Sequence, residues 1–144
     1  MAHSPKATAK RLVELGAPAM LIQLAQGTAA PGILAAELQT PRAFYTLVAD
    51  SRFPFRKSIV PLWETNGESI TGWVVGPPPQ IVSYYYEDPP ETYELIGGSI
   101  REALEGKLGW LYLETGCEID EVLAAARVCG LPDPEGFVRR LEAG

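Results

Sequence analysis

Three turn signals between residues 59 and 96 most constrain the fold of this 144-residue chain. Asn66-Gly67, the run Gly76 to Pro79, and Asp88-Pro89-Pro90 separate segments rich in branched and aromatic residues. Asn-Gly between two such segments is a strong hairpin signal, because both residues accept positive φ. Strands joined by turns this short pair antiparallel, since parallel pairs need a long crossover. The segments therefore predict an antiparallel meander of about four or five strands.

The composition of the segments sets the expected strands. Residues 43–49 (AFYTLVA) are rich in aromatic and branched side chains and are predicted to form a strand before the meander. The strands of the meander are expected at 59–64, 69–75, 80–87 and 92–96. The sheet section of the chain would then cover residues 43–96.

The stretch 83–95 (SYYYEDPPETYEL) holds four of the six tyrosines beside four carboxylates. Because alternate residues of a strand share a face, Tyr84 and Tyr86 are expected to be buried, and Ser83 and Tyr85 half-exposed. A stacking surface for bases would need basic residues between the aromatic side chains. Acidic residues stand there instead, which argues against nucleic acid. The stretch favours contact with a protein, because tyrosine offers rigid amphipathic area, although core tyrosines beside a solvated turn would give the same pattern.

Helical patterns flank the sheet section on both sides. Residues 10–40 are predicted to form short helices after a flexible tail at 1–9, and residues 99–142 a C-terminal helical section. The second section opens with the capping box Ser99 to Glu102, in which each end residue satisfies a backbone donor of the other. Residues 109–113 (GWLYL) are strongly apolar and fit either state. The expected fold is one α+β domain of residues 1–144.

An apolar stretch near the N-terminus, Leu15 to Ala36, carries no charged residue. Pro18, Gly27 and Pro31 interrupt it. A membrane-spanning helix needs about 20 consecutive apolar residues, so this stretch predicts short helices and no membrane segment.

The two cysteines do not suggest a disulfide. Cys117 and Cys129 bracket a predicted helix at 119–128, and twelve residues at 1.5 Å each place them about 18 Å apart. A disulfide needs Cα atoms within about 7 Å. Free thiols favour a reducing compartment, and we expect the chain in the cytoplasm. The one histidine, His3, lies near the N-terminus, so neither a zinc site nor any cofactor is expected.

Charge is distributed unevenly along the chain. Residues 1–57 hold seven basic and three acidic groups, and residues 58–144 hold five basic and fifteen acidic groups. The two sections therefore carry net charges of +4 and −10. Either they attract each other within the domain, or the acidic section attracts a basic partner. A negative surface is a poor ligand for nucleic acid, because phosphate binding depends on Lys and Arg.

Catalytic motifs are sparse. With one histidine near the N-terminus, neither a Ser-His-Asp triad nor a Cys-His pair can be built. Four carboxylates remain as candidates for a general acid and base or for a divalent-cation site, namely Glu64, Glu68, Glu87 and Asp88. Their spacing matches no known catalytic or cation-binding loop. No catalytic or metal-binding residue is assigned, and a metal-assisted hydrolase remains an alternative function.

A longer run of motifs resembles a known family. The segments IVPLWETNGESITGWVV, QIVSYYYEDP and YELIGGSIREALEGKL, within residues 59–108, are similar to the core of the SUKH superfamily. The matching positions are Pro61-Leu62, Asn66-Gly67, Tyr84 to Asp88, and Ser99 to Leu104. The resemblance implies a small α+β protein that binds without catalysing. Many members are bacterial immunity proteins that neutralise toxins, and others are regulatory scaffolds.

The charge and the resemblance together predict a non-enzymatic, cytoplasmic module that binds a basic toxin domain through an acidic surface. Nuclease toxins carry basic surfaces, which an acidic inhibitor can occupy with fast, salt-sensitive association. The sequence sets no oligomeric state. The expected contact residues share acidic or aromatic character: Glu64, Glu68, Trp73, Tyr85, Glu87, Asp88, Glu91 and Glu94. Trp73 fits the core equally well, because it shares a strand face with two other apolar positions.

A regulatory domain that binds a small ligand is the first alternative, ahead of the hydrolase. In that case we expect an apolar groove over the sheet, lined by Trp63, Trp73 and Tyr86.

Overall fold

Six α-helices, one 3-10 helix and four strands make up the computed structural model, which describes residues 4–47, 49–50 and 52–144. The N-terminal helices are α1 (Pro5–Glu14), α2 (Ala19–Ala25), the 3-10 helix η1 (Gly32–Ala36) and α3 (Ala43–Leu47). The strands are β1 (Ile59–Thr65), β2 (Ser69–Val74), β3 (Gln80–Tyr85) and β4 (Glu94–Gly97). The C-terminal helices are α4 (Ile100–Leu113), α5 (Ile119–Val128) and α6 (Pro134–Ala143).

The strands form one antiparallel sheet in the order β1-β2-β3-β4, which confirms the predicted α+β meander. The predicted Asn-Gly turn joins β1 to β2. Asn66 and Gly67 have φ values of 48° and 68°, and the Glu68 N–H donates to the Thr65 carbonyl at 2.8 Å. Two successive residues with positive φ are the geometry that matches the twist of a tight hairpin.

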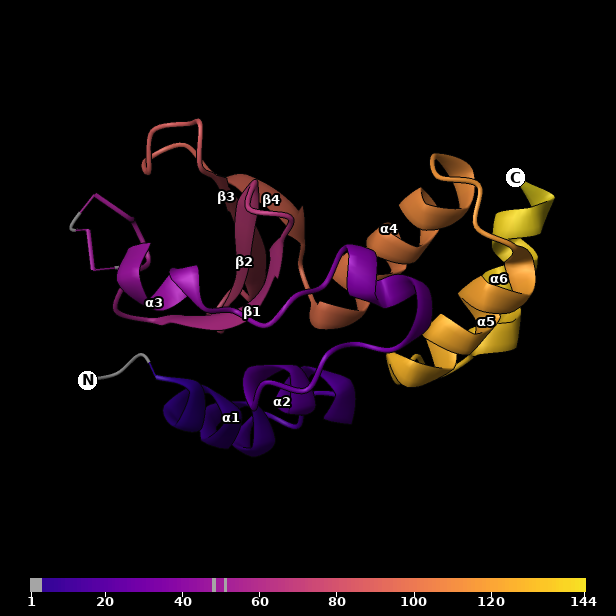
Figure 1. Cartoon of the computed structure of the whole chain (residues 1–144), viewed down its shortest axis with the longest axis horizontal. Helices are drawn as coiled ribbons and strands as arrows, with labels where there is room; N and C mark the ends of the chain where they lie inside the picture. Colours follow the sequence, from indigo (N-terminus) through magenta and orange to yellow (C-terminus); the bar gives the residue numbers. More distant parts are fainter. Residues whose placement is uncertain (1–3, 48, 51) are drawn as a thin grey trace.

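The sheet is buried on both faces. One face packs against the helices in the larger core, which includes Leu62 and Ile81. The other face packs in a smaller cluster with Phe44 of α3 and Phe53, against Ile70, Val82 and Tyr84 among others. In Figure 1, α1 and α2 lie beneath the sheet, and α4 lies between the sheet and the α5–α6 pair. The larger core therefore joins N-terminal and C-terminal helices to the same sheet.

Two expectations for the N-terminal half are wrong. Residues 43–47 form the helix α3 and not a strand. The expected tail at 1–9 is helical from Pro5 onward, since the Ser4 side chain caps α1 by accepting the Ala7 N–H at 3.1 Å. Residues 1–3 lie outside the described residues.

Helices α4 and α6 begin at side chains that cap their first turn. Ser99 Oγ accepts the Glu102 N–H at 3.1 Å, and Asp133 accepts the Gly136 N–H at 3.1 Å. The return half of the predicted capping box is displaced by one residue, because the Glu102 carboxylate accepts the N–H of Gly98 at 3.3 Å. Residues 109–113 form the last turns of α4. Helix α5 has the predicted bounds, and Cys117 and Cys129 at its two ends are free.

A partly buried ion pair links the two halves of the chain. The Lys107 Nζ of α4 lies 3.0 Å from the Glu37 carboxylate, which follows η1. Their side chains are 23% and 11% exposed.

Among the described residues, no helix combines the length and the apolar character needed to cross a bilayer.

Candidate functional site

Acidic side chains gather at the end of the sheet that contains the β1–β2 turn. Ser69 pairs with Tyr85, and Ser83 pairs with Glu94, so the loop between β3 and β4 emerges beside that turn. Glu68 lies in the turn itself. We call the exposed residues at this end the acidic tyrosine surface: Glu68, Tyr85, Glu87, Asp88, Glu91 and Glu94.

Tyr85 lies at the centre of this surface. Its side chain is 39% exposed, and its hydroxyl donates to Glu94 Oε1 at 3.1 Å. Partial burial raises the pKa of Tyr85, and the bonded Glu94 together with the charges of Asp88 and Glu68 raises it further. Three segments therefore bring carboxylates near one phenol, which stays neutral and able to donate a hydrogen bond at physiological pH.

Hydrogen bonds order the loop between β3 and β4. The Tyr86 N–H donates to the Glu68 carbonyl at 2.9 Å, and the Asp88 N–H donates to the Tyr85 carbonyl at 3.0 Å. Thr92 Oγ1 donates to the Pro89 carbonyl at 2.7 Å. The carboxylates of this loop are thus carried on a defined backbone.

The carboxylates of the acidic tyrosine surface form no ion pair with any described residue. The ion pairs within residues 4–47, 49–50 and 52–144 join other groups: Arg11–Glu14, Arg52–Asp50, Lys107–Glu37 and Arg127–Glu135. The guanidinium of Arg52 donates to Asp50 at 2.7 Å, and this bond is the main cause of the raised pKa of Arg52, to which the charge of Glu91 adds a smaller effect. That bond holds the pKa of Asp50 down to about 2. The surface therefore keeps its negative charge.

Glu64, also predicted as a contact residue, lies at the same end of the sheet but differs from the residues of this surface, because its carboxylate binds the backbone. Its Oε2 accepts the N–H groups of Arg42 at 2.5 Å and Phe44 at 2.8 Å, at the start of α3. A carboxylate at a helix N-terminus satisfies donors that lack an intrahelical partner. Glu64 thus stabilises the helix that covers the second face of the sheet.

Trp73 also lies elsewhere. It is partly buried, four residues along β2 from Ser69, which at about 3.3 Å per residue is about 13 Å from the acidic end. Trp63, Trp73 and Tyr86 do not line one groove, because Trp63 is fully buried and Tyr86 lies at the acidic end, beside Tyr85. Trp73 instead lines a separate cavity at the far end of β2.

The expected division of strand β3 into two faces is half right. Tyr84 is buried and Tyr85 is exposed, as predicted, but Tyr86 is 40% exposed and Ser83 is 4% exposed. Ser83 is buried because helices cover its face of the sheet, where its hydroxyl bonds that of Thr71 at 2.6 Å. Tyr86 follows the last residue of β3 and so has left the sheet.

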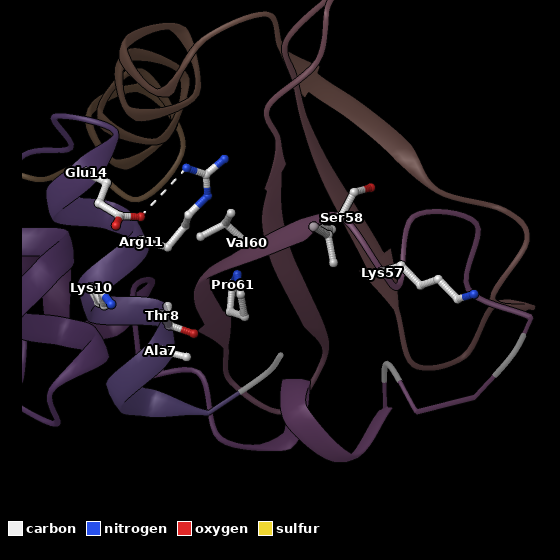
Figure 2. Close-up of a pocket in the computed structure, with 10 residues that line it drawn as sticks. Ala7, Thr8, Lys10, Arg11, Glu14, Lys57, Ser58, Val60 and Pro61 are labelled. Carbon is white, nitrogen blue, oxygen red and sulfur yellow. Dashed lines mark ion pairs between the residues drawn. The ribbon is translucent and has the colours of Figure 1, made fainter. Parts of the chain in front are cut away.

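A second candidate is a cavity of about 340 Å³ between α1 and the start of β1, shown in Figure 2. Its lining includes Lys10, Arg11 and Lys57. In Figure 2, Arg11 turns toward Glu14, whose carboxylate lies 3.9 Å away, and Lys57 extends away from the cavity. The basic groups do not converge on one point, so the cavity offers an anion no shared site.

The described part of the chain contains no cluster of side chains suited to a metal ion. No three His, Cys, Asp or Glu side chains there are placed to hold a metal ion. Of the four carboxylates considered for catalysis, Glu64 already binds the backbone of α3.

Two exposed apolar side chains beside the acidic tyrosine surface were not predicted as contacts. Tyr93 is 40% exposed and Leu95 is 59% exposed, on either side of Glu94. Strand β4 is one of the two edge strands of the sheet, so it has a neighbouring strand on one side only and its side chains are less buried. Its edge position could have been predicted from its place as the last strand of a meander.

Comparison of the chain with protein-family models, curated proteins and solved structures finds no match in any of the three. The resemblance to the SUKH superfamily therefore remains a prediction from the sequence motifs.

Proposed function

We propose that this chain is a non-enzymatic protein-binding module that uses the acidic tyrosine surface to bind a basic protein. The observation that carries the proposal is Tyr85, exposed at the surface and surrounded by Glu68, Asp88 and Glu94, with no described cation paired to any of them.

The composition of the surface suits a protein partner. Tyrosine supplies contact area at low entropic cost, and the Tyr85–Glu94 hydrogen bond already holds the ring and one carboxylate in place. Groups that are ordered before binding lose less freedom when the complex forms. Exposed carboxylates of one sign attract a basic partner from a distance and raise the association rate. The neighbouring Tyr93 and Leu95 add apolar area.

The narrower proposal is an immunity protein that neutralises a basic toxin domain in the cytoplasm. It is supported by the sequence resemblance and by the fit between an acidic surface and the basic active-site surface of a nuclease. A regulatory role with a different basic partner would use the same surface.

The test compares two triple variants with equal changes of charge. Glu68→Gln/Asp88→Asn/Glu94→Gln removes three charges from the acidic tyrosine surface, and Glu114→Gln/Asp120→Asn/Glu142→Gln removes three exposed charges from the C-terminal helices. Association with a panel of basic toxin domains is measured by biolayer interferometry over a range of salt concentrations. We expect the first variant to associate about tenfold or more slowly and to lose most of its salt dependence. The second should behave nearly as the unaltered chain.

Equal association rates for the two triple variants would contradict the proposal. So would binding that strengthens with salt, or a panel in which no basic domain binds the unaltered chain.

A further inference from the structure

An apolar cavity of about 350 Å³ lies at the end of the sheet opposite the acidic tyrosine surface. Four parts of the chain meet there: the loop between α1 and α2, the end of β2 with Pro79, the start of α4, and the loop between α5 and α6. Figure 1 shows the start of α4 between the sheet and the α5–α6 pair, above α2. This volume is within the usual range for small-molecule sites, about 300–1,000 Å³.

The walls of the cavity are apolar and preformed. Trp73, Ile100, Leu104 and Leu131 supply large apolar side chains. Three prolines, whose backbone φ is fixed, complete the rim: Pro18, Pro79 and Pro132. Walls of this kind need little reordering when a ligand enters, so less binding energy is lost to entropy.

The thiol of Cys129 is part of the apolar wall. It is 1% exposed, and burial raises its pKa to about 12. At physiological pH it is therefore a neutral thiol, and it behaves as a small hydrophobic group.

Arg101 gives the cavity its charge. It is the one charged side chain among the described residues that line the cavity. It is exposed, and it forms no ion pair with another described residue. The nearby Glu102 is directed to the N–H of Gly98, at 3.3 Å, and is not part of the lining. A guanidinium at the mouth of an apolar cavity matches a carboxylate attached to an apolar body.

We propose that this cavity binds a small carboxylic acid with an aromatic or branched aliphatic body. The apolar part occupies the space between Trp73, Leu104 and Leu131, and the carboxylate pairs with Arg101. The site is separate from the acidic tyrosine surface, because it lies at the other end of β2 and shares no residue with that surface.

The test uses two probes with the same phenylethyl body and different head groups, the charged carboxylate of 3-phenylpropionate and the neutral hydroxymethyl group of 3-phenylpropanol. Each is titrated into the full chain and followed by amide and indole N–H chemical shifts in NMR spectra. We expect saturable shifts around the cavity at probe concentrations on the order of 1 mM, with the acid bound more tightly than the alcohol. Arg101→Gln should weaken binding of the acid about tenfold and leave binding of the alcohol unchanged.

Three further variants distinguish binding in the cavity from binding elsewhere on the protein. Ala17→Phe adds a side chain to the lining and should abolish binding of both probes. If Ala17→Phe fails to fold, Pro132→Trp replaces it. This change is at an exposed position of the rim and should also abolish binding of both probes. Arg139→Gln removes an exposed arginine outside the lining and should change neither affinity.

Absence of saturable shifts in the unaltered chain would overturn the proposal. So would saturable shifts that persist in a folded Ala17→Phe or Pro132→Trp variant. Equal affinity for the acid and the alcohol would overturn the role of Arg101. Binding to a basic protein domain should be unaffected by all these variants. A failure of the cavity proposal can therefore be distinguished from a failure of the protein-binding proposal.

Discussion

The two ends of strand β2 differ in nearly every property that governs recognition. At the Ser69 end, exposed carboxylates surround a tyrosine, and the surface is open. At the Val74 end, helices and proline-containing loops border an apolar cavity with the guanidinium of Arg101 at its edge. The first end suits a large partner that approaches through long-range attraction, and the second suits a small molecule that fits a shape.

The difference follows from where the helices contact the sheet. Helices α1 and α2 pack against β1, and α4 packs against β4. The loop between β3 and β4 extends past the end of β3, where Tyr85 and Tyr86 are already exposed. One strand can therefore carry two sites that do not interfere with each other, provided that the sheet between them is rigid.

The largest expected effect tests that rigid middle section. A Cβ atom at Gly72 would lie 2.5 Å from Ile59 Cγ1 and 2.9 Å from Phe44 Cζ. We expect Gly72→Val to lower the free energy of unfolding by about 3 kcal/mol or more, measured by urea denaturation, because the packed second face has no room for it. Gly106→Ala is the control. Gly106 lies within α4, and a Cβ atom there would meet nothing within 4 Å apart from its chain neighbours and the nearby backbone of the helix, so the change should stabilise the helix by about 0.5–1 kcal/mol. A Gly72→Val variant of normal stability would show that the sheet middle is loosely packed.

A smaller effect distinguishes two carboxylates at the acidic end. Glu64→Ala removes the acceptor for the backbone N–H groups of Arg42 and Phe44, so we expect a loss of about 1–3 kcal/mol in urea denaturation. Glu68→Ala removes an exposed charge and should change stability by less than about 0.5 kcal/mol. Equal losses for the two variants would mean that both carboxylates serve the fold, which would weaken the case for a contact surface.

The smallest effect concerns pH at the cavity end. Burial raises the pKa of Cys129 from 9.0 to about 12, so above pH 9 the unfolded chain binds fewer protons than the folded chain. The contribution of this raised pKa to the free energy of unfolding is fully present below pH 9 and is lost as the pH rises toward 12. We expect the unfolding free energy to fall by about 1 kcal/mol per pH unit near pH 10, and the fall to be shallower in Cys129→Ala. Cys117→Ala, at a partly exposed thiol, is the matched control. Parallel pH profiles for all three chains would indicate that the cavity wall is hydrated.

The sequence predicts those parts of the fold whose signals are local. The Asn66-Gly67 turn requires positive φ at two positions, and the structure has it. The helix 119–128 ends before Gly130, whose φ is 73°. In both places the residues that define the element lie next to each other in the sequence. Local patterns of this kind are sufficient to place the meander and the C-terminal helices.

The wrong prediction for residues 43–47 depends on contacts between distant residues. Residues 43–47 have the composition of a strand, but Glu64, about twenty residues later, accepts the N–H groups that begin α3. Part of the outer edge of β1 is also occupied, because Gln39 and Glu64 exchange backbone hydrogen bonds at 2.9 Å. Tertiary contacts of this kind override strand propensity.

The candidate site was predictable to a similar extent. The sequence placed the carboxylates of the loop near Tyr85, because a short turn keeps them together. It did not separate Glu64 from Glu68, since both are acidic residues of one hairpin. The apolar cavity was not predictable, because its walls come from four segments between Gly16 and Pro132 that only the folded chain brings together.

The ion pair between Glu37 and Lys107 has a consequence for how the chain can be divided. The two residues are seventy positions apart in the sequence, yet they form an ion pair in which both side chains are largely buried. A shortened protein that began at β1 would retain Lys107 without its carboxylate, and an enclosed ammonium with no counter-ion is costly. The same truncation would remove Leu12, Leu24 and Leu34 from the larger core, which they share with sheet residues, so we expect the motif-bearing sheet not to fold without the first forty residues.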